Sequence, residues 1–239
     1  MKTRFEINPC CKVEKIPLGD GVNFVLVVDD LLLNPNEVVD FALSAAYFDP
    51  VGTDQTLYPG VRDIMPAPYG RALKQWAERI ISKEYFAGKT LKSPEPICKL
   101  SLVTLPPEDL VAGQKIPHID SACEYDFAFV HYLCDQSFGG TSLYRYKPSG
   151  EICITRDHVS ALGEMAAAAS TKAEEHSGYM KGDTSLFERV AKIEAKVNRL
   201  VLYKSNLLHC ANIPTSKSHK KDVRNGRLTV ASFMYFQPI

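Results

Sequence analysis

The residues best suited to chemistry are His118 and Asp120, two positions apart, and His209, much further along the chain. If the segment around His118 is extended, both side chains point to one side, because side chains alternate along a strand. They can then bind one metal ion, with His209 as the third ligand. Two histidines and one carboxylate, with coordination positions left open, are typical of non-haem Fe(II) oxygenases. We therefore predict that these residues bind Fe(II) and form a catalytic centre; a surface histidine beside a turn-capping aspartate is the alternative.

Arg227 is the second candidate, because it begins an apolar run that is predicted to be the last strand. By alternation it shares a face with Thr229. An arginine that points into a protein interior needs an anion, since an unpaired buried charge is strongly disfavoured. A carboxylate satisfies it through two hydrogen bonds. Capping of the strand in solvent is the alternative, and Arg224, in the polar stretch just before, is a second candidate for the same anion.

Strands are predicted for the segments that carry these residues. They are expected at 97–105, 126–134, 142–146, 199–203 and 227–236, where β-branched and aromatic residues cluster. The glycine-containing turn at 137–141 is expected to join 126–134 and 142–146 into a hairpin. His131 is expected in the core on one face, whereas His158, His176 and His219 are expected in solvent.

The first third of the chain reads as strands followed by two helices. Residues 1–30 are strand-rich, and residues 58–62 read as a loop with a turn. One helix is expected to begin with Asn34 as its N-cap and Pro35 at its first position. A second amphipathic helix is expected over 70–87, with Trp76 as a core anchor.

Residues 157–197 are predicted to be a helical insert, with helices at 161–175 and 184–197. The second helix is inferred from apolar residues at helical spacing from Leu186 to Val197. The insert is expected to act as a lid or as a homodimer contact. Because the candidate ligands lie on both sides of it, we expect one domain over 1–239, with a support region at 1–96 and a core at 97–236.

Composition excludes several classes of protein. The 239 residues are 45% apolar, and 28 basic residues balance 28 acidic ones, which argues against a nucleic-acid partner. The sequence contains no run of about 18 apolar residues, so no membrane span is expected. The charged N-terminus lacks the apolar region of a secretory signal. Seven cysteines without a C-x-x-C pair argue against a disulfide framework or a thiolate zinc site. A reducing cytoplasm is expected.

The order of these motifs resembles the 2-oxoglutarate- and Fe(II)-dependent dioxygenases, most of all their prolyl-hydroxylase-like branch. Nearly the whole chain is also similar to an uncharacterised bacterial family of that superfamily, DUF6445. The dioxygenase resemblance rests on His118-x-Asp120, Tyr132-Leu133, Gly139-Gly140-Thr141, His209 and Arg227-x-Thr229. The family resemblance rests on Asn34-Pro35-Asn36-Glu37-Val38, Tyr58-Pro59-Gly60-Val61-Arg62 and Asn198-Arg199-Leu200-Val201-Leu202-Tyr203.

The resemblance implies a mainly β fold with flanking helices, built on a double-stranded β-helix of the jelly-roll, cupin-like kind. It implies that iron and 2-oxoglutarate are cofactors, with O2 as oxidant, and that Arg227, Tyr132 and Thr229 bind 2-oxoglutarate. The implied reaction hydroxylates a peptide, amino acid or small metabolite and releases succinate and CO2. A cupin-like metal- or ligand-binding module without redox turnover is the alternative. A zinc hydrolase fits less well, because no H-E-x-x-H motif is present.

Overall fold

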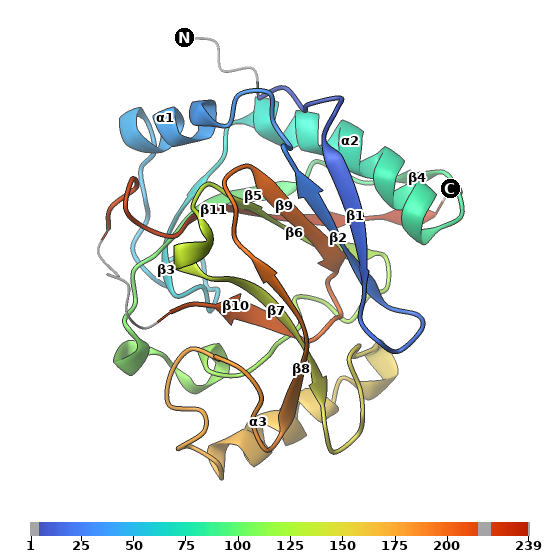
Figure 1. Ribbon diagram of the computed structural model, residues 1–239, viewed down its shortest axis with the longest axis vertical. Helices are drawn as coiled ribbons and strands as arrows, with labels where there is room; N and C mark the ends of the chain where they lie inside the picture. Colours follow the sequence, from blue (N-terminus) through green and yellow to red (C-terminus); the bar gives the residue numbers. More distant parts are fainter. Residues whose placement is uncertain (1–4, 215–220, 239) are drawn as a thin grey trace.

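The computed structural model describes residues 5–214 and 221–238, and antiparallel sheets form its centre (Figure 1). The seven-stranded large sheet has the order β1 (Lys12–Pro17), β2 (Phe24–Asp29), β9 (Arg199–Lys204), β6 (Asp126–Tyr132), β11 (Leu228–Tyr235), β5 (Ile97–Val103), β3 (Gly60–Ile64). The three-stranded small sheet has the order β10 (His209–Asn212), β7 (Gly140–Tyr146), β8 (Phe187–Glu194). A short ribbon pairs β12 (Gln237–Pro238) with β4 (Leu91–Lys92).

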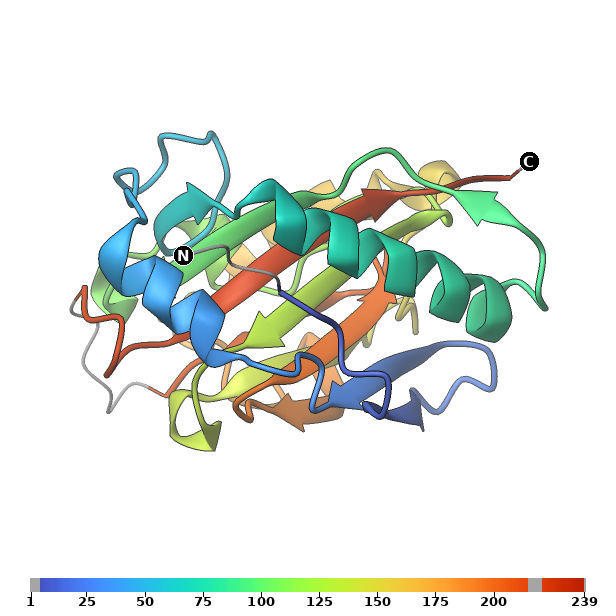
Figure 2. The ribbon, with the colours of Figure 1, turned by 90° about the horizontal axis from the view of Figure 1, so that it is seen from above.

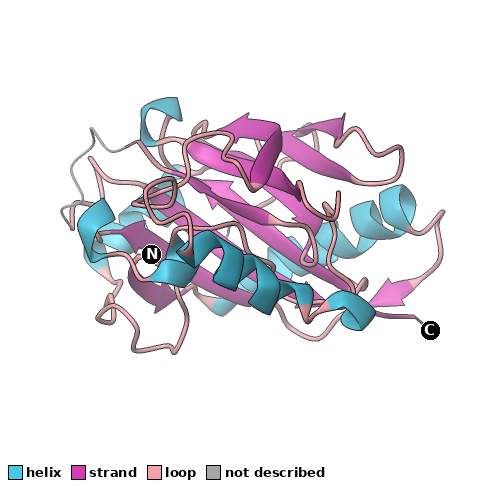
Figure 3. Ribbon diagram, turned by 90° about the horizontal axis from the view of Figure 1, so that it is seen from below, coloured by secondary structure: helices cyan, strands magenta, loops and turns pink. Residues whose placement is uncertain are grey.

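Helices cover the outer faces of the two sheets (Figures 2 and 3). α1 (Asn36–Ser44) and α2 (Ala67–Tyr85) pack on the large sheet, where Trp76 joins a core cluster with Phe127. α3 (Ala161–Ser170) lies outside the small sheet, where Met165 packs in a cluster with Phe187. Loops of the described residues also contain 3-10 helices at Pro107–Asp109, Ala112–Gln114, Gln136–Phe138 and Arg156–His158. The mainly β class with flanking helices is therefore confirmed, and Trp76 is the predicted core anchor.

The central strand β11 shows how the large sheet serves both a core and a cavity. Leu228 and Val230 point outward into the cluster under the helices. Thr229, Ala231 and Phe233 point the other way and line a cavity between the sheets. The alternation expected along this strand is thus confirmed. Among the described residues, no helix combines the length and the apolar composition needed to cross a bilayer.

The predicted hairpin between residues 126–134 and 142–146 is wrong. β6 belongs to the large sheet, whereas β7 pairs with β8 and β10 in the small one. The turn between them carries the chain from one sheet to the other. It needs Gly139, whose φ is 88° and whose missing Cβ would lie 1.7 Å from the carbonyl oxygen of Asn212. A strand–turn–strand pattern indicates the two strands but not whether they pair with each other.

The predicted helix at 184–197 is also wrong, because this segment forms β8. The register between β7 and β8 shifts at Leu143 and Tyr144, so β8 contains an extra residue. Phe187 therefore packs on the outer side of the small sheet and Ile193 on the inner side. The bulge breaks the two-residue period and leaves apolar spacings that resemble those of a helix. Only the first half of the predicted helical insert is helical, and α3 ends at Ser170 rather than at 175.

Element boundaries in the first third of the chain also differ from the predictions. Asn34 is not the cap of the first helix, because Pro35 occupies the N-cap position and no side chain caps it. α2 begins at Ala67, three residues earlier than expected, after Pro66. The loop expected at 58–62 becomes β3 from Gly60 onward, since this segment pairs with β5. The three N-terminal strands thus complete the large sheet itself.

Candidate functional site

Backbone pairing brings the two candidate histidines together. His118 and His209 form an isolated antiparallel bridge, with both N–H···O distances 2.9 Å, and their ring centroids lie 4.5 Å apart. The N–H of Asp120 donates to the carbonyl oxygen of Ser205 at 2.9 Å, which fixes the loop beside the turn after β9. One ligand atom from each of His118, Asp120 and His209 lies within 4.8 Å of the others. The structure therefore assembles the predicted trio.

The hydrogen bonds of His209 direct its Nε2 towards Asp120. Its Nδ1–H donates to the carbonyl oxygen of Leu207 at 2.8 Å, so Nε2 is left with a lone pair. Nε2 faces Oδ2 of Asp120 at 3.3 Å. At this distance the two atoms can share a cation, which is either a proton on Nε2, favoured by the raised pKa of His209, or a metal ion. Two metal ligands at right angles, each about 2.1 Å from an ion, are separated by about 3 Å, so the spacing fits a shared metal.

Electrostatics favour the metal-binding forms of His118 and Asp120, whereas at His209 the Asp120 carboxylate outweighs burial and raises the pKa. Burial lowers the pKa of His118 to about 4, helped by the nearby His209, so His118 is neutral at neutral pH. Burial alone would raise the pKa of Asp120, but His209, His118 and Arg62 outweigh it and lower the pKa. His209 is buried, whereas His118 and Asp120 remain accessible from the cavity. The site thus offers a neutral imidazole at His118 and an ionised carboxylate at Asp120, and at His209 an incoming ion would take the place of a proton.

The trio opens into a cavity of about 400 Å³ between the two sheets. Its walls come from β3, β6, β10 and β11 and from the loops at 56–59 and 113–114. Most of the lining side chains are apolar or aromatic. They include Leu57, Tyr58, Val103, Ile119, Val130, Tyr179, Tyr203 and Phe233. This size and composition are those of a small-molecule site.

Arg227 lines the same cavity and is incompletely satisfied. It is 6% exposed, and its Nη2 donates to the carbonyl oxygen of Gly140 at 3.0 Å. Its Nε is buried without a hydrogen-bond partner, and no acidic side chain among the described residues pairs with it. The guanidinium instead lies 5.5 Å from the ring centroid of Tyr132. A buried cation in this condition calls for an anionic ligand.

The other residues predicted to bind 2-oxoglutarate separate into two groups. Thr229 lines the cavity, as expected. Tyr132 does not line it: the Tyr132 hydroxyl is hydrogen-bonded to Thr141 at 2.5 Å, and its ring supports Arg227. Arg224 is exposed and does not line the cavity. Of the two arginines considered for the anion, Arg227 is therefore the one placed to meet it.

Sequence reasoning missed Tyr58 and Arg62 as cavity residues. Both belong to a segment read as a loop, and only the pairing of β3 with β5 turns Arg62 inward. Burial raises the pKa of Tyr58, opposed by Arg227 and Arg62, and the Arg62 guanidinium lies 4.7 Å from the centroid of its ring. Its hydroxyl is near Thr229 but outside hydrogen-bonding geometry. No spacing rule would have identified these residues.

The remaining histidines follow the predictions only in part. His131 is a satisfied core residue, as expected, and His158 lies at the surface beside Glu151. His176 is wrongly predicted to be solvated: it is 6% exposed and packs edge-on against Phe187. His219 lies outside the described residues. All seven cysteines are free in the structure.

The chain belongs to the family of unknown function DUF6445, whose model matches residues 9–234. This confirms the family expected from the sequence. No curated protein matches the chain.

Several solved structures are similar to this one at low identity. One is the non-heme alpha ketoglutarate dependent epimerase SnoN from nogalamycin biosynthesis, 14% identical, with a TM-score of 0.47, 91% of this chain and 79% of that chain covered. Another is HygX from Streptomyces hygroscopicus with nickel and 2-oxoglutarate bound. It is 11% identical, with a TM-score of 0.46, and the match covers 90% of this chain and 84% of that chain. A third is an N-substituted L-amino acid dioxygenase from Burkholderia ambifaria. It is 11% identical, with a TM-score of 0.42, and the match covers 92% of this chain and 84% of that chain.

Proposed function

We propose that the chain is an Fe(II)- and 2-oxoglutarate-dependent oxygenase. It hydroxylates a peptide, amino acid or small metabolite, with release of succinate and CO2, on a double-stranded β-helix core. The observation that carries this proposal is the buried Arg227, whose Nε lacks a partner in the cavity onto which His118, Asp120 and His209 open. A metal-binding module without turnover has no need of a buried carboxylate-binding cation beside its metal.

Each residue has a defined part in this proposal. His118, Asp120 and His209 would hold the iron, and Arg227 would bind the far carboxylate of 2-oxoglutarate, beside the hydroxyl of Thr229. When bound, iron and 2-oxoglutarate supply the activation of O2 that a protein side chain cannot provide. Tyr132 holds the guanidinium in place through its ring, and its own hydroxyl is held by Thr141.

The apolar walls contribute by controlling water. Val130, Tyr203 and Phe233 line the cavity onto which the trio opens, and the Tyr203 ring packs against His209 at a centroid distance of 4.7 Å and an angle of 58°. A cavity of this kind strengthens the electrostatic contacts within it and keeps bulk water from the reacting groups. The substrate C–H bond would therefore meet the metal site in a largely apolar environment.

The test is an anaerobic titration of the Fe(II)-loaded protein with 2-oxoglutarate, followed by visible absorption. Chelation of iron by the keto acid is expected to give a charge-transfer band, which His118→Ala should abolish together with bound iron. His158→Ala is the matched control, because His158 is a surface residue outside the cavity. Absence of the band in the wild-type protein would refute the proposed function and favour a binding module.

A further inference from the structure

The cavity contains a second buried arginine, Arg62, which the proposed function leaves unused. Arg62 is 8% exposed and lines the cavity from β3. It pairs in register with Ser101 of β5, which pairs with Thr229 of β11. Directly paired residues point to the same face of a sheet, so the three side chains form a row on the inner face. A second cation therefore faces the space between the sheets.

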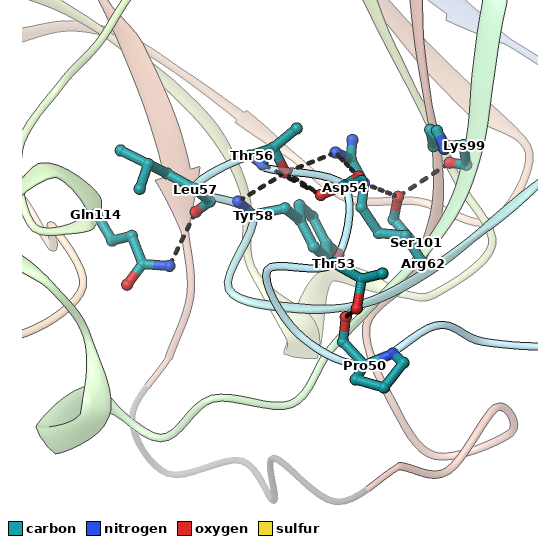
Figure 4. Close-up of polar contacts among 10 residues, drawn as sticks. All are labelled: Pro50, Thr53, Asp54, Thr56, Leu57, Tyr58, Arg62, Lys99, Ser101 and Gln114. Carbon is teal, nitrogen blue, oxygen red and sulfur yellow. Dashed lines mark hydrogen bonds and ion pairs between the residues drawn. The ribbon is translucent and has the colours of Figure 1, made fainter.

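The hydrogen bonds of Arg62 leave one end of its guanidinium free (Figure 4). Nε donates to the hydroxyl of Ser101 at 3.2 Å, and Nη1 donates to Asp54 and to Thr56, both at 3.1 Å. The face of the Tyr58 ring lies 4.7 Å from Cζ. These contacts occupy three of the five N–H donors, and both hydrogens of Nη2 remain without a partner among the described residues.

Arg62 borders two hollows, of which the cavity between the sheets is much the larger. A hollow on its other side, bordered by Asp54 and Lys99, has a volume of about 10 Å³. That is room for about one water molecule. The large cavity, at about 400 Å³, lies within the range of small-molecule sites.

Arg62 and Arg227 address different parts of that cavity. Arg62 lies two strands away from β11, in register with Thr229, whereas Arg227 is two residues before Thr229. With strands about 4.8 Å apart and a rise of about 3.4 Å per residue, their Cα atoms are separated by roughly 12 Å. If Arg227 holds the cosubstrate, Arg62 is left for a different molecule. Arg62 and Asp120 line the same cavity.

The charges and walls of the cavity restrict that molecule further. Among the described lining residues, Asp120 is the only acid, and it belongs to the metal site. Asp54 does not line the cavity and already pairs with Arg62. No carboxylate is therefore left to accept an ammonium group, while Leu57, Ile119 and Phe233 offer apolar surface.

We propose that Arg62 binds the carboxylate of the substrate, which is a small carboxylic acid with an apolar body and no free ammonium group. This inference rests on the proposed function, because it assigns Arg227 to 2-oxoglutarate. Asp54 and Thr56 hold the guanidinium so that Nη2 faces the cavity. The loop that carries them is tied in turn to Gln114, which donates to the carbonyl oxygen of Leu57 at 2.9 Å.

The test uses three probes with one carbon skeleton and different charges. They are 4-methylpentanoate, its carboxamide and leucine; 3-phenylpropanoate, its carboxamide and phenylalanine form a larger set. Binding is measured by ligand-observed NMR on the anaerobic Fe(II) protein with saturating 2-oxoglutarate. In at least one set we expect the wild-type protein to bind the carboxylate at least tenfold more tightly than the amide or the amino acid. Arg62→Gln should abolish that preference and leave the affinity for 2-oxoglutarate unchanged.

Two further variants separate binding from support of the loop. Arg62→Lys keeps the cation and should keep part of the preference. Asp54→Asn breaks the ion pair but leaves the cation, and it should keep the preference as well. If Arg62→Gln fails to fold, as judged by its circular dichroism melt, these two variants carry the test.

Three results would overturn the assignment of Arg62. They are no carboxylate preference in the wild-type protein with either set, a tenfold or greater loss of 2-oxoglutarate affinity in Arg62→Gln, and complete loss of the preference in folded Asp54→Asn. Failure of the proposed function gives a different result. If the wild-type protein does not bind 2-oxoglutarate but Arg62 still decides the carboxylate preference, the function falls and the role of Arg62 stands.

Discussion

His131 and Arg227 are buried basic side chains on opposite faces of the same sheet. His131 points outward from β6, where its Nδ1 meets the hydroxyl of Tyr69 at 3.1 Å and its Nε2 meets Oδ1 of Asn198 at 3.2 Å. Asn198 also bonds both the N–H and the carbonyl of Leu32 at 2.9 Å. Burial lowers the pKa of His131 to about 4, so the ring is neutral and both of its nitrogens are satisfied.

Arg227, on the inner face, is neither neutral nor fully hydrogen-bonded. It stays charged at any relevant pH, one of its nitrogens lacks a partner, and a cavity lies beside it. Most buried polar groups in native proteins are hydrogen-bonded, so the exceptions need an explanation. The comparison teaches that the satisfied outer network holds the structure together, whereas the unsatisfied inner group is available to a ligand.

Loss of a metal ligand should have the largest effect on the inner face. His209→Ala removes a buried imidazole from the trio and should weaken Fe(II) binding by more than about 100-fold, because two side chains cannot close the site. Metal analysis after anaerobic dialysis measures this effect. His131→Gln is the matched control on the outer face, and iron loss in that variant would break the comparison.

Arg227→Gln should give the next largest effect. Removing one partner of a buried charge pair costs about 2–5 kcal/mol, so 2-oxoglutarate should bind roughly 30-fold to several thousand-fold more weakly. Calorimetric titration measures the change, with the exposed Arg224→Gln as control. In the ligand-free protein, the free energy of unfolding should stay equal or rise, because an unpaired buried charge is removed. A marked loss of stability would show that Arg227 is structural.

His131→Phe should show the opposite behaviour. It leaves the hydroxyl of Tyr69 without its acceptor in the core, which should lower the free energy of unfolding by about 2 kcal/mol. Binding of 2-oxoglutarate should not change, since His131 faces away from the cavity. Urea unfolding and calorimetric titration of the same sample measure both quantities. If His131→Phe instead weakened 2-oxoglutarate binding and left the free energy of unfolding unchanged, His131 would belong to the ligand site and not to the structural network.

The pH dependence of stability should sharpen the comparison with a smaller effect. The pKa of His131 is about 4 when folded and about 6.5 when unfolded, so the unfolded state binds more protons between these values. Its contribution to stability is complete above pH 6.5 and is lost as the pH falls towards 4. Between pH 7.5 and 5.5 the wild-type protein should lose about 1 kcal/mol more than His131→Gln. Equal slopes in the two proteins would argue against a buried neutral ring.

Local pattern predicted much of the fold because it reports on short-range constraints. Alternation along β11 correctly placed Thr229 on the cavity side, and the apolar stripe around Trp76 correctly predicted α2. The prediction failed where the partner strand decides the structure. β8 was read as a helix because a bulge moves Phe187 and Ile193 to opposite faces, and no local pattern reveals the register shift that causes it.

The sequence by itself determined the chemical types at the site: two histidines and an aspartate suited to a metal, and an arginine at the start of an apolar strand. Tertiary structure alone decided which of these groups meet. The bridge between His118 and His209 joins two distant segments, and the pairing of β3 with β5 turns Arg62 into the cavity. The physical reason is that hydrogen-bond register between strands fixes both neighbour and facing direction, and register depends on the whole sheet.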